Sequence, residues 1–145
     1  MSRVILAVIL FLLLIASDID FQQRQHSRSL AQHQTANLYA SQMLLLADMI
    51  NEYRHQTDRQ DGEVPRDQLG LPFSPDNRIQ YQLQQGRLWI WMPEQPGLID
   101  ALRSRSRGSA LIGTLRGGQL VWLSGMATGL TAPQAVADGN VIYLN

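Results

Sequence analysis

The sequence contains no cysteine, so disulfides, thiolate catalysis and cysteine-based metal sites are all excluded. It also lacks an excess of either charge, because twelve basic side chains balance twelve acidic ones. Nucleic-acid binding requires a positive face for the phosphates, which a chain without a basic surplus does not favour. We therefore exclude nucleic acid as the main partner. Because the chain has no cysteine, we also expect the fold to gain no stability from an oxidising compartment.

Sequence motifs of the common catalytic and cofactor sites are also missing. No G-x-S-x-G, H-E-x-x-H or P-loop pattern occurs. Serine, histidine and aspartate are present, but no spacing predicts that they meet as a triad. We expect no enzyme activity, no catalytic or metal-ligating residue and no cofactor. A small hydrolase, whose polar residues converge only in the folded chain, stays open as an alternative.

One apolar run stands near the N-terminus, from Val4 to Ala16. As a helix it spans roughly 20 Å at about 1.5 Å per residue, whereas a bilayer core is about 30 Å thick. Length alone favours a signal peptide. A signal peptidase, however, needs small residues where this sequence has Leu14 or Ile15. The residues that we take to carry a retained anchor are Val4, Leu10, Phe11, Leu14 and Ile15.

We therefore interpret residues 1–20 as a membrane anchor, and a cleaved signal that releases a periplasmic binding domain is the alternative. Arg3 can reach the lipid headgroups in spite of the short run. Arg3 precedes the run and two aspartates, Asp18 and Asp20, follow it. The positive-inside rule then places the N-terminus in the cytoplasm and the rest of the chain in the periplasm. The expected location is a single pass through the inner membrane, in contact with its lipid.

Residues 22–37 are polar and lack glycine and proline, which predicts a helical stalk over residues 21–37. Residues 38–145 follow as the exported domain. The domain begins with apolar residues at spacings of 4, 3, 4 and 3, which predicts an amphipathic helix. That spacing suits both a core within one chain and a coiled-coil seam between copies, so a homo-oligomer stays open. The stripe comprises Tyr39, Met43, Leu46, Ile50 and Tyr53, widened by Leu38, Leu45 and Met49.

The rest of the domain has the alternation and turns of antiparallel strands. Hairpin turns are expected at Gln85-Gly86 and Gly117-Gly118. The predicted fold is α+β, a long helix packed on a mostly antiparallel sheet of about five strands. The segments are strands at 79–84, 88–92, 110–115, 119–123 and 141–144, a short helix at 98–103, and an irregular loop at 124–140.

Two groups of side chains are candidates for contact with a partner. Trp89 and Trp91 share one face of their strand, where they are either buried or exposed as an interface anchor. Arg103, Arg105 and Arg107 alternate with serines toward a loop at Gly108. They either meet an acidic partner or a lipid phosphate, or form a solvated loop.

The segments "NLYASQMLLLADMINEYR", "GSALIGTLRGGQLVWLSG" and "TAPQAVADGNVIYLN" resemble the PilM-type proteins encoded with thin type IV pili on conjugative plasmids. The actin-like cytoplasmic protein of the same name is unrelated. The resemblance covers most of the chain. It implies an inner-membrane component of the pilus base or pilin-transport apparatus, without enzyme activity. The implied partners are other pilus-assembly proteins or pilin subunits.

The layout is also pilin-like, because an apolar helix continues into an amphipathic helix on an antiparallel sheet. A prepilin has a glycine before its cleavage point and a glutamate five residues into the mature helix. The run from Val4 to Ala16 contains neither. An unprocessed, pilin-like accessory subunit fits these residues better, and an atypical minor pilin that enters the fibre is the alternative.

Overall fold

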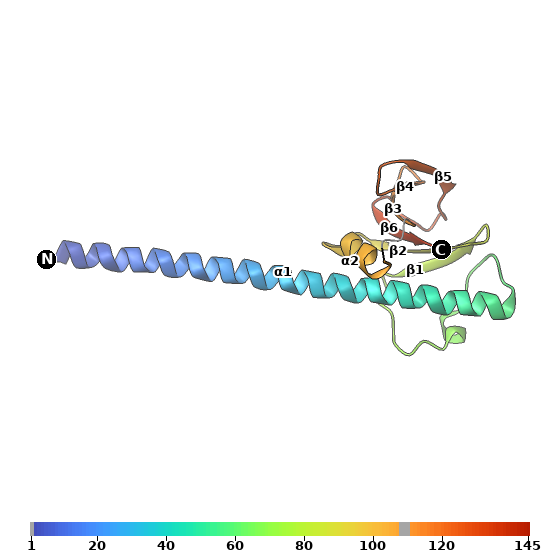
Figure 1. Ribbon diagram of the computed structural model, residues 1–145, viewed down its shortest axis with the longest axis horizontal. Helices are drawn as coiled ribbons and strands as arrows, with labels where there is room; N and C mark the ends of the chain where they lie inside the picture. The colour runs from blue at the N-terminus through green and yellow to red at the C-terminus, as the bar shows by residue number, and fades with distance from the viewer. Residues whose placement is uncertain (1, 108–110) are drawn as a thin grey trace.

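The computed structural model describes residues 2–107 and 111–145. Its first element, α1 (Ser2–Thr57), is a single α-helix of 56 residues. At about 1.5 Å per residue it is about 84 Å long. Neither glycine nor proline occurs within these bounds, so no residue breaks the helix. The apolar run, the predicted stalk and the amphipathic segment therefore form one continuous helix, and half of it projects from the domain (Figure 1).

Only the C-terminal half of α1 packs against the rest of the chain. Tyr39 and Tyr53, at the ends of the predicted stripe, are partly buried against the core. The expectation that Leu38 and Leu45 widen this stripe is wrong, because they lie on the opposite side and are 55% and 42% exposed. The buried positions include three alanines, which let the helix approach the sheet closely. They are Ala36, Ala40, Met43, Leu46, Ala47 and Ile50.

The sheet has six antiparallel strands in the order β1-β2-β6-β3-β4-β5. The last strand thus lies between the two hairpins, pairing with β2 and β3. The α+β class and antiparallel sheet are as predicted. The strands are β1 (Gln80–Gln84), β2 (Arg87–Pro93), β3 (Ile112–Arg116), β4 (Gln119–Trp122), β5 (Ala127–Thr131) and β6 (Asn140–Leu144).

The sixth strand, β5, lies in the segment that the sequence predicted to be an irregular loop. Its pairing with β4 contains a register shift between Gln119 and Val121, and Gly129 within it has a φ of 72°. A bulged strand of this kind lacks the apolar alternation that predicts a strand. The predicted turns are confirmed, since both residues of Gln85-Gly86 and of Gly117-Gly118 have positive φ.

The sheet separates two apolar clusters. Leu88, Ile90 and Met92 face α1, while Trp89 and Trp91 face the other way. In Figure 1 strands β3 to β5 curl away from α1. The curl brings the two edge strands together, where Gln84 Nε2 of β1 donates to the Thr131 carbonyl of β5 at 3.2 Å. Strand β2 is therefore covered on both faces.

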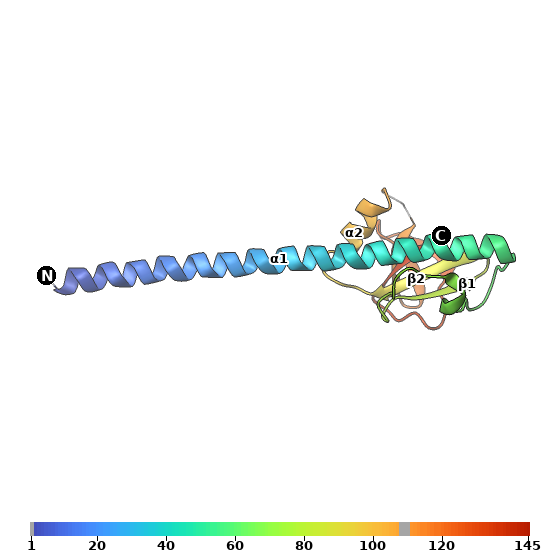
Figure 2. The same cartoon turned by 90° about the horizontal axis from the view of Figure 1, so that it is seen from below.

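Two short helices complete the fold. Helix α2 (Leu98–Arg105) packs beside α1, as Figure 2 shows from below. The 3₁₀ helix η1 (Arg66–Leu69) lies in the loop between α1 and β1 and contacts α1. Both elements hold α1 where it crosses the sheet, and neither reaches the projecting half.

Candidate functional site

The projecting half of α1 is the most unusual surface of the molecule. Residues 2–35 are exposed throughout, and an 18-residue window of this helix has a mean hydropathy of 2.6 with none of its residues buried. By length and composition the helix can cross a membrane. All five residues taken as the anchor are exposed, Val4 at 68% and Ile15 at 43%. The domain offers this apolar surface no partner within the described residues.

A polar segment separates the apolar run from the domain. Residues 17–35 form helix and are exposed throughout, and they span about 28 Å at about 1.5 Å per residue. The predicted stalk is thus helical, as the absence of glycine and proline indicated. Because one rigid helix carries both the run and the domain, it fixes the distance between them.

Helix α2 holds α1 at the point where it enters the domain. Gly97, which precedes α2, has a φ of 79°, and a Cβ there would lie 3.5 Å from the Ala36 Cβ. Leu98 and Leu102 of α2 are fully buried. Arg105 Nε donates to Asn37 Oδ1 at 3.4 Å. This packing against Ala36 and Asn37 defines the end of the stalk.

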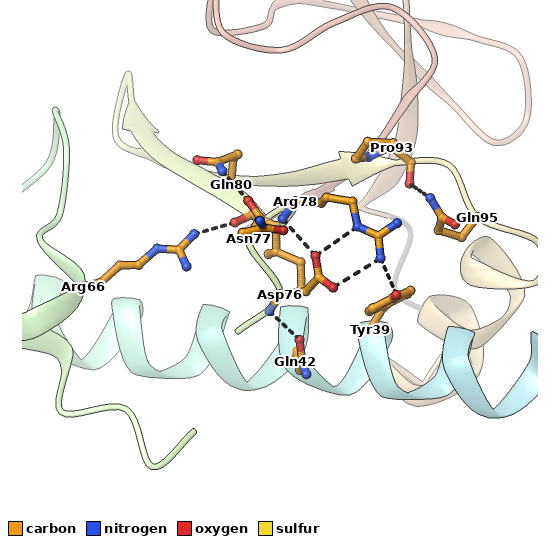
Figure 3. A network of polar contacts seen from close by, with 10 residues as sticks. Tyr39, Gln42, Arg66, Asp76, Asn77, Arg78, Gln80, Pro93 and Gln95 are labelled. Atoms are coloured by element: carbon orange, nitrogen blue, oxygen red, sulfur yellow. Dashed lines mark hydrogen bonds and ion pairs between the residues drawn. The ribbon is translucent and has the colours of Figure 1, made fainter. Parts of the chain in front are cut away.

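A polar network ties the loop before β1 to the opposite flank of α1 (Figure 3). Arg78 Nε pairs with Asp76 Oδ1 at 3.0 Å, and Arg78 Nη2 donates to the Tyr39 hydroxyl. The Asp76 backbone N–H donates to Gln42 Oε1 at 3.0 Å. The hydrogen bond that the Arg78 guanidinium donates to the Asp76 carboxylate lowers the pKa of Asp76 and raises the pKa of Arg78. The network is therefore held by a charged pair.

A second contact fastens the same loop to β1. Arg66 Nη2 donates to the Ile79 carbonyl at 2.6 Å, and its guanidinium carbon lies 5.6 Å from the centroid of the Tyr81 ring. The Tyr81 hydroxyl donates to the Val64 carbonyl at 2.7 Å. Burial raises the pKa of Tyr81. We did not predict either network, because loop residues that meet only in the fold leave no periodic signal in the sequence.

The two tryptophans proposed as an interface anchor are not at the surface. Trp89 is 1% exposed and Trp91 is 4% exposed, because the curled half of the sheet covers them. The buried alternative is confirmed, and the exposed one is wrong. Neither indole is available to a partner in this fold.

The three arginines are all exposed, but they do not form one loop. Arg103 and Arg105 lie on the last turn of α2, which runs two residues beyond the predicted end. Arg107 follows in a left-handed conformation with a φ of 57°. The predicted loop residue Gly108 and the predicted strand residue Ala110 lie outside the described residues. A contact of these arginines with acidic groups stays a prediction.

The hollow with a volume of about 410 Å³ between α2 and the β3–β4 hairpin holds three charged side chains, Glu94, Arg116 and Asp138. The Asp138 carboxylate accepts hydrogen bonds from the backbone N–H groups of Gly117 and Gly118, at 3.1 and 3.3 Å. It thereby fixes the β3–β4 turn. A carboxylate used in this way holds a hairpin, and no histidine or serine lines the hollow beside it.

The chain was compared with curated proteins, with solved structures and with protein-family models. A search of curated proteins finds no match. The crystal structure of an Escherichia coli B7A protein designated PilM matches with a TM-score of 0.68 and 29% identity, over 79% of this chain and 94% of that one. A Pseudomonas aeruginosa 2192 protein designated PilM matches with a TM-score of 0.46 and 29% identity, over 73% and 90%. The PilM family model matches residues 10–144, nearly the whole chain. The chain belongs to the PilM family.

Proposed function

We propose that this PilM-family chain is a pilus-related structural protein of the inner membrane. It acts in the assembly machine of a type IV thin pilus used in conjugation, as the family resemblance implies. It contacts other pilus-assembly proteins or pilin subunits and has no enzyme activity. The observation that carries the membrane part of this proposal is the exposed apolar run at the end of a rigid helix.

The exposed run supports an anchor for a physical reason. Burial of apolar surface contributes about 25 cal/mol per Å², and nothing within the described part of the domain covers Val4 to Ala16. A bilayer supplies that cover. The run is shorter than a bilayer core is thick, and the flanks compensate, because Arg3 reaches the cytoplasmic headgroups and Ile19 and Phe21 enter the periplasmic interface.

The architecture gives the anchor a mechanical role. A helix without a break leads from the run into the domain, and α2 and the Arg78 network fix that helix against the sheet. Beyond Phe21, which enters the interface, residues 22–35 hold the domain about 21 Å above the membrane surface. A protein that presents a folded surface at a set height suits a scaffold at the base of a fibre.

A second function is an atypical minor pilin. The long helix that continues into an antiparallel sheet favours it, whereas the apolar run lacks the glycine and glutamate of a prepilin. The two functions differ in location. A base component stays in the membrane fraction, and a minor pilin appears in pili sheared from the cells.

The experiment is deletion of the gene, followed by complementation and mating in liquid. Deletion should abolish pili, and normal piliation would contradict the proposal. A complementing chain with Leu10→Asp and Leu14→Asp should fail to restore pili, because charges in the run prevent insertion. The matched control, Gln22→Asp with Gln25→Asp on the exposed stalk, should restore them. The intact mass of the wild-type chain from the membrane fraction should be that of a chain that still contains Met1 to Ala16.

A further inference from the structure

One face of α1 stays exposed where the helix lies on the domain. Leu38 and Leu45 are 55% and 42% exposed, whereas Met43 and Leu46, on the side of the helix toward the sheet, are fully buried. Residues seven apart lie on the same side of a helix. The two leucines therefore form an apolar strip on the side of α1 that faces away from the sheet.

The strip continues toward the membrane with a regular spacing. Going back from Leu45, the positions on this face alternate in steps of 4 and 3, the pattern of a coiled-coil seam. We call these six residues the outer stripe; they are Ser27, Ala31, Gln34, Leu38, Ser41 and Leu45. Each is exposed except Ser41, which is half-buried. None is charged, and the Ser41 hydroxyl is already bound to the Asn37 carbonyl at 2.8 Å.

The neighbouring elements leave the outer stripe open. On one flank α2 reaches α1 through Arg105 and Asn37. On the other flank the loop before β1 reaches it through Asp76 and Gln42. The stripe lies between these two contacts, and Leu38 remains more than half exposed there. The elements on both sides are fixed in place and present the stripe as a straight edge.

We propose that the outer stripe pairs with the outer stripe of a second copy of this chain, in parallel and in register. This inference rests on the proposed membrane anchor. Anchored chains of one kind all point the same way, so their helices meet in parallel. Leu38 lies 22 residues beyond Ala16, about 33 Å along the helix, and it lies at the same height in a second copy. The leucines of two copies therefore meet without a shift of one helix along the other.

The composition of the stripe agrees with a symmetric contact. A two-fold interface places each residue against its own counterpart, so a charged residue would meet a like charge. The stripe has none between Ser27 and Leu45. Leu38 and Leu45 supply the apolar layers, and serine and alanine let the two backbones approach. Gln34 supplies one polar layer, which fixes register in coiled coils.

Cysteine cross-linking of the full chain in its own membranes tests the pairing. Because the chain has no native cysteine, the introduced cysteine is its only thiol. The stripe variants are Leu38→Cys, Ser41→Cys and Leu45→Cys. The matched controls are Gln25→Cys and Ser29→Cys, which are exposed on the far side of the helix. After mild oxidation with copper phenanthroline, the stripe variants should form at least about fivefold more dimer than the controls, because a disulfide needs Cα atoms within roughly 7 Å.

A charge variant then tests the stripe itself. Leu38→Glu with Leu45→Glu, placed in the Ser41→Cys background, brings four carboxylates together in a dimer and should remove most of the cross-link. Both leucines are exposed, so the fold should tolerate the change, and an unchanged urea midpoint checks this. Leu38→Gln with Leu45→Gln is the matched uncharged control. It should lose less of the cross-linked dimer than the glutamate pair does.

Three results would overturn the pairing: equal dimer on both faces, no dimer at any stripe position, or stripe cysteines that link to a different protein. The anchor is judged separately by fractionation. A membrane-bound chain with unpatterned cross-links removes the pairing and leaves the proposed function intact. A cleaved, soluble chain that still links only through the stripe removes the anchor and keeps the pairing.

Discussion

Arg78 donates a hydrogen bond to the hydroxyl of Tyr39, across 39 positions of sequence. Its guanidinium carbon also lies 5.0 Å from the centroid of the Tyr39 ring, a cation–π distance. Tyr39 stands near the point where α1 enters the domain, and Arg78 immediately precedes the strand region. The contact therefore ties the long helix to the sheet at the base of the stalk.

We expect the stability of the domain to depend on pH through Asp76. The hydrogen bond from Arg78 lowers the pKa of this carboxyl below its ordinary value of 3.8. The charged form is thus favoured by the fold, so its contribution is complete above that value and is lost as the pH falls through the lowered pKa. The urea midpoint should fall on acidification, and Asp76→Asn should make the profile flatter below about pH 4.

The control for this prediction is Asp100→Asn, at an exposed carboxyl in the first turn of α2. Because the Asp76–Arg78 pair is intact in this variant, its urea midpoint should still fall on acidification. Identical profiles for wild type and Asp76→Asn would mean that the Arg78 network does not stabilise the domain. Measurements use the full chain in detergent.

We expect Gly113→Ala to destabilise the domain by about 1–3 kcal/mol, the usual cost of overpacking. A Cβ at this position of β3 would lie 2.5 Å from the Val121 carbonyl oxygen and 2.7 Å from Leu120 Cδ1. Backbone cannot move aside without loss of the β3–β4 pairing. Gly118→Ala is the control, because it has open space around it and only a φ of 78° to strain. It should cost about 1 kcal/mol, and a larger loss at Gly118 than at Gly113 would contradict the clash.

The sequence predicted the parts of this fold that repeat. The spacing of Met43, Leu46 and Ile50 located the core side of α1, and the alternation around Leu88 located β2. The turns followed from Gly86 and Gly118, since their positive φ suits glycine. Such features are local, so a single sequence carries them.

What the sequence did not predict depends on contacts between distant segments. The burial of Trp89 requires the sheet to curl, which places β3 to β5 over it. Strand β5 has a bulge at Gly129 and little apolar alternation. Leu38 and Leu45 fit an apolar stripe by composition, and only the position of the sheet shows that they lie outside it. The Arg78 network joins a loop to a helix and has no periodic signal at all.

We expect Trp89→Ala to cost about 3–5 kcal/mol, as large core deletions do. Trp89 is fully enclosed, so its removal leaves a cavity. Arg103→Ala is the control from the other predicted contact group, and at an exposed position it should change stability by no more than about 0.5 kcal/mol. Urea unfolding of the full chain in detergent gives both values. A Trp89→Ala chain of unchanged stability would place this indole at the surface after all.

The two faces of α1 should respond differently to the same substitution. Leu46→Ala removes a fully buried side chain and should cost about 2–5 kcal/mol. Leu38→Ala removes one that is 55% exposed, and in dilute monomer it should cost no more than about 0.5 kcal/mol. If two copies pair through Leu38, the cost should grow with protein concentration, because association stabilises the folded chain by mass action. Leu46→Ala should show no such growth beyond that of the wild type. Urea midpoints over a hundredfold range of protein-to-detergent ratio distinguish the two variants. An equal loss of stability in Leu38→Ala and Leu46→Ala at every ratio would mean that the outer face is covered within one chain.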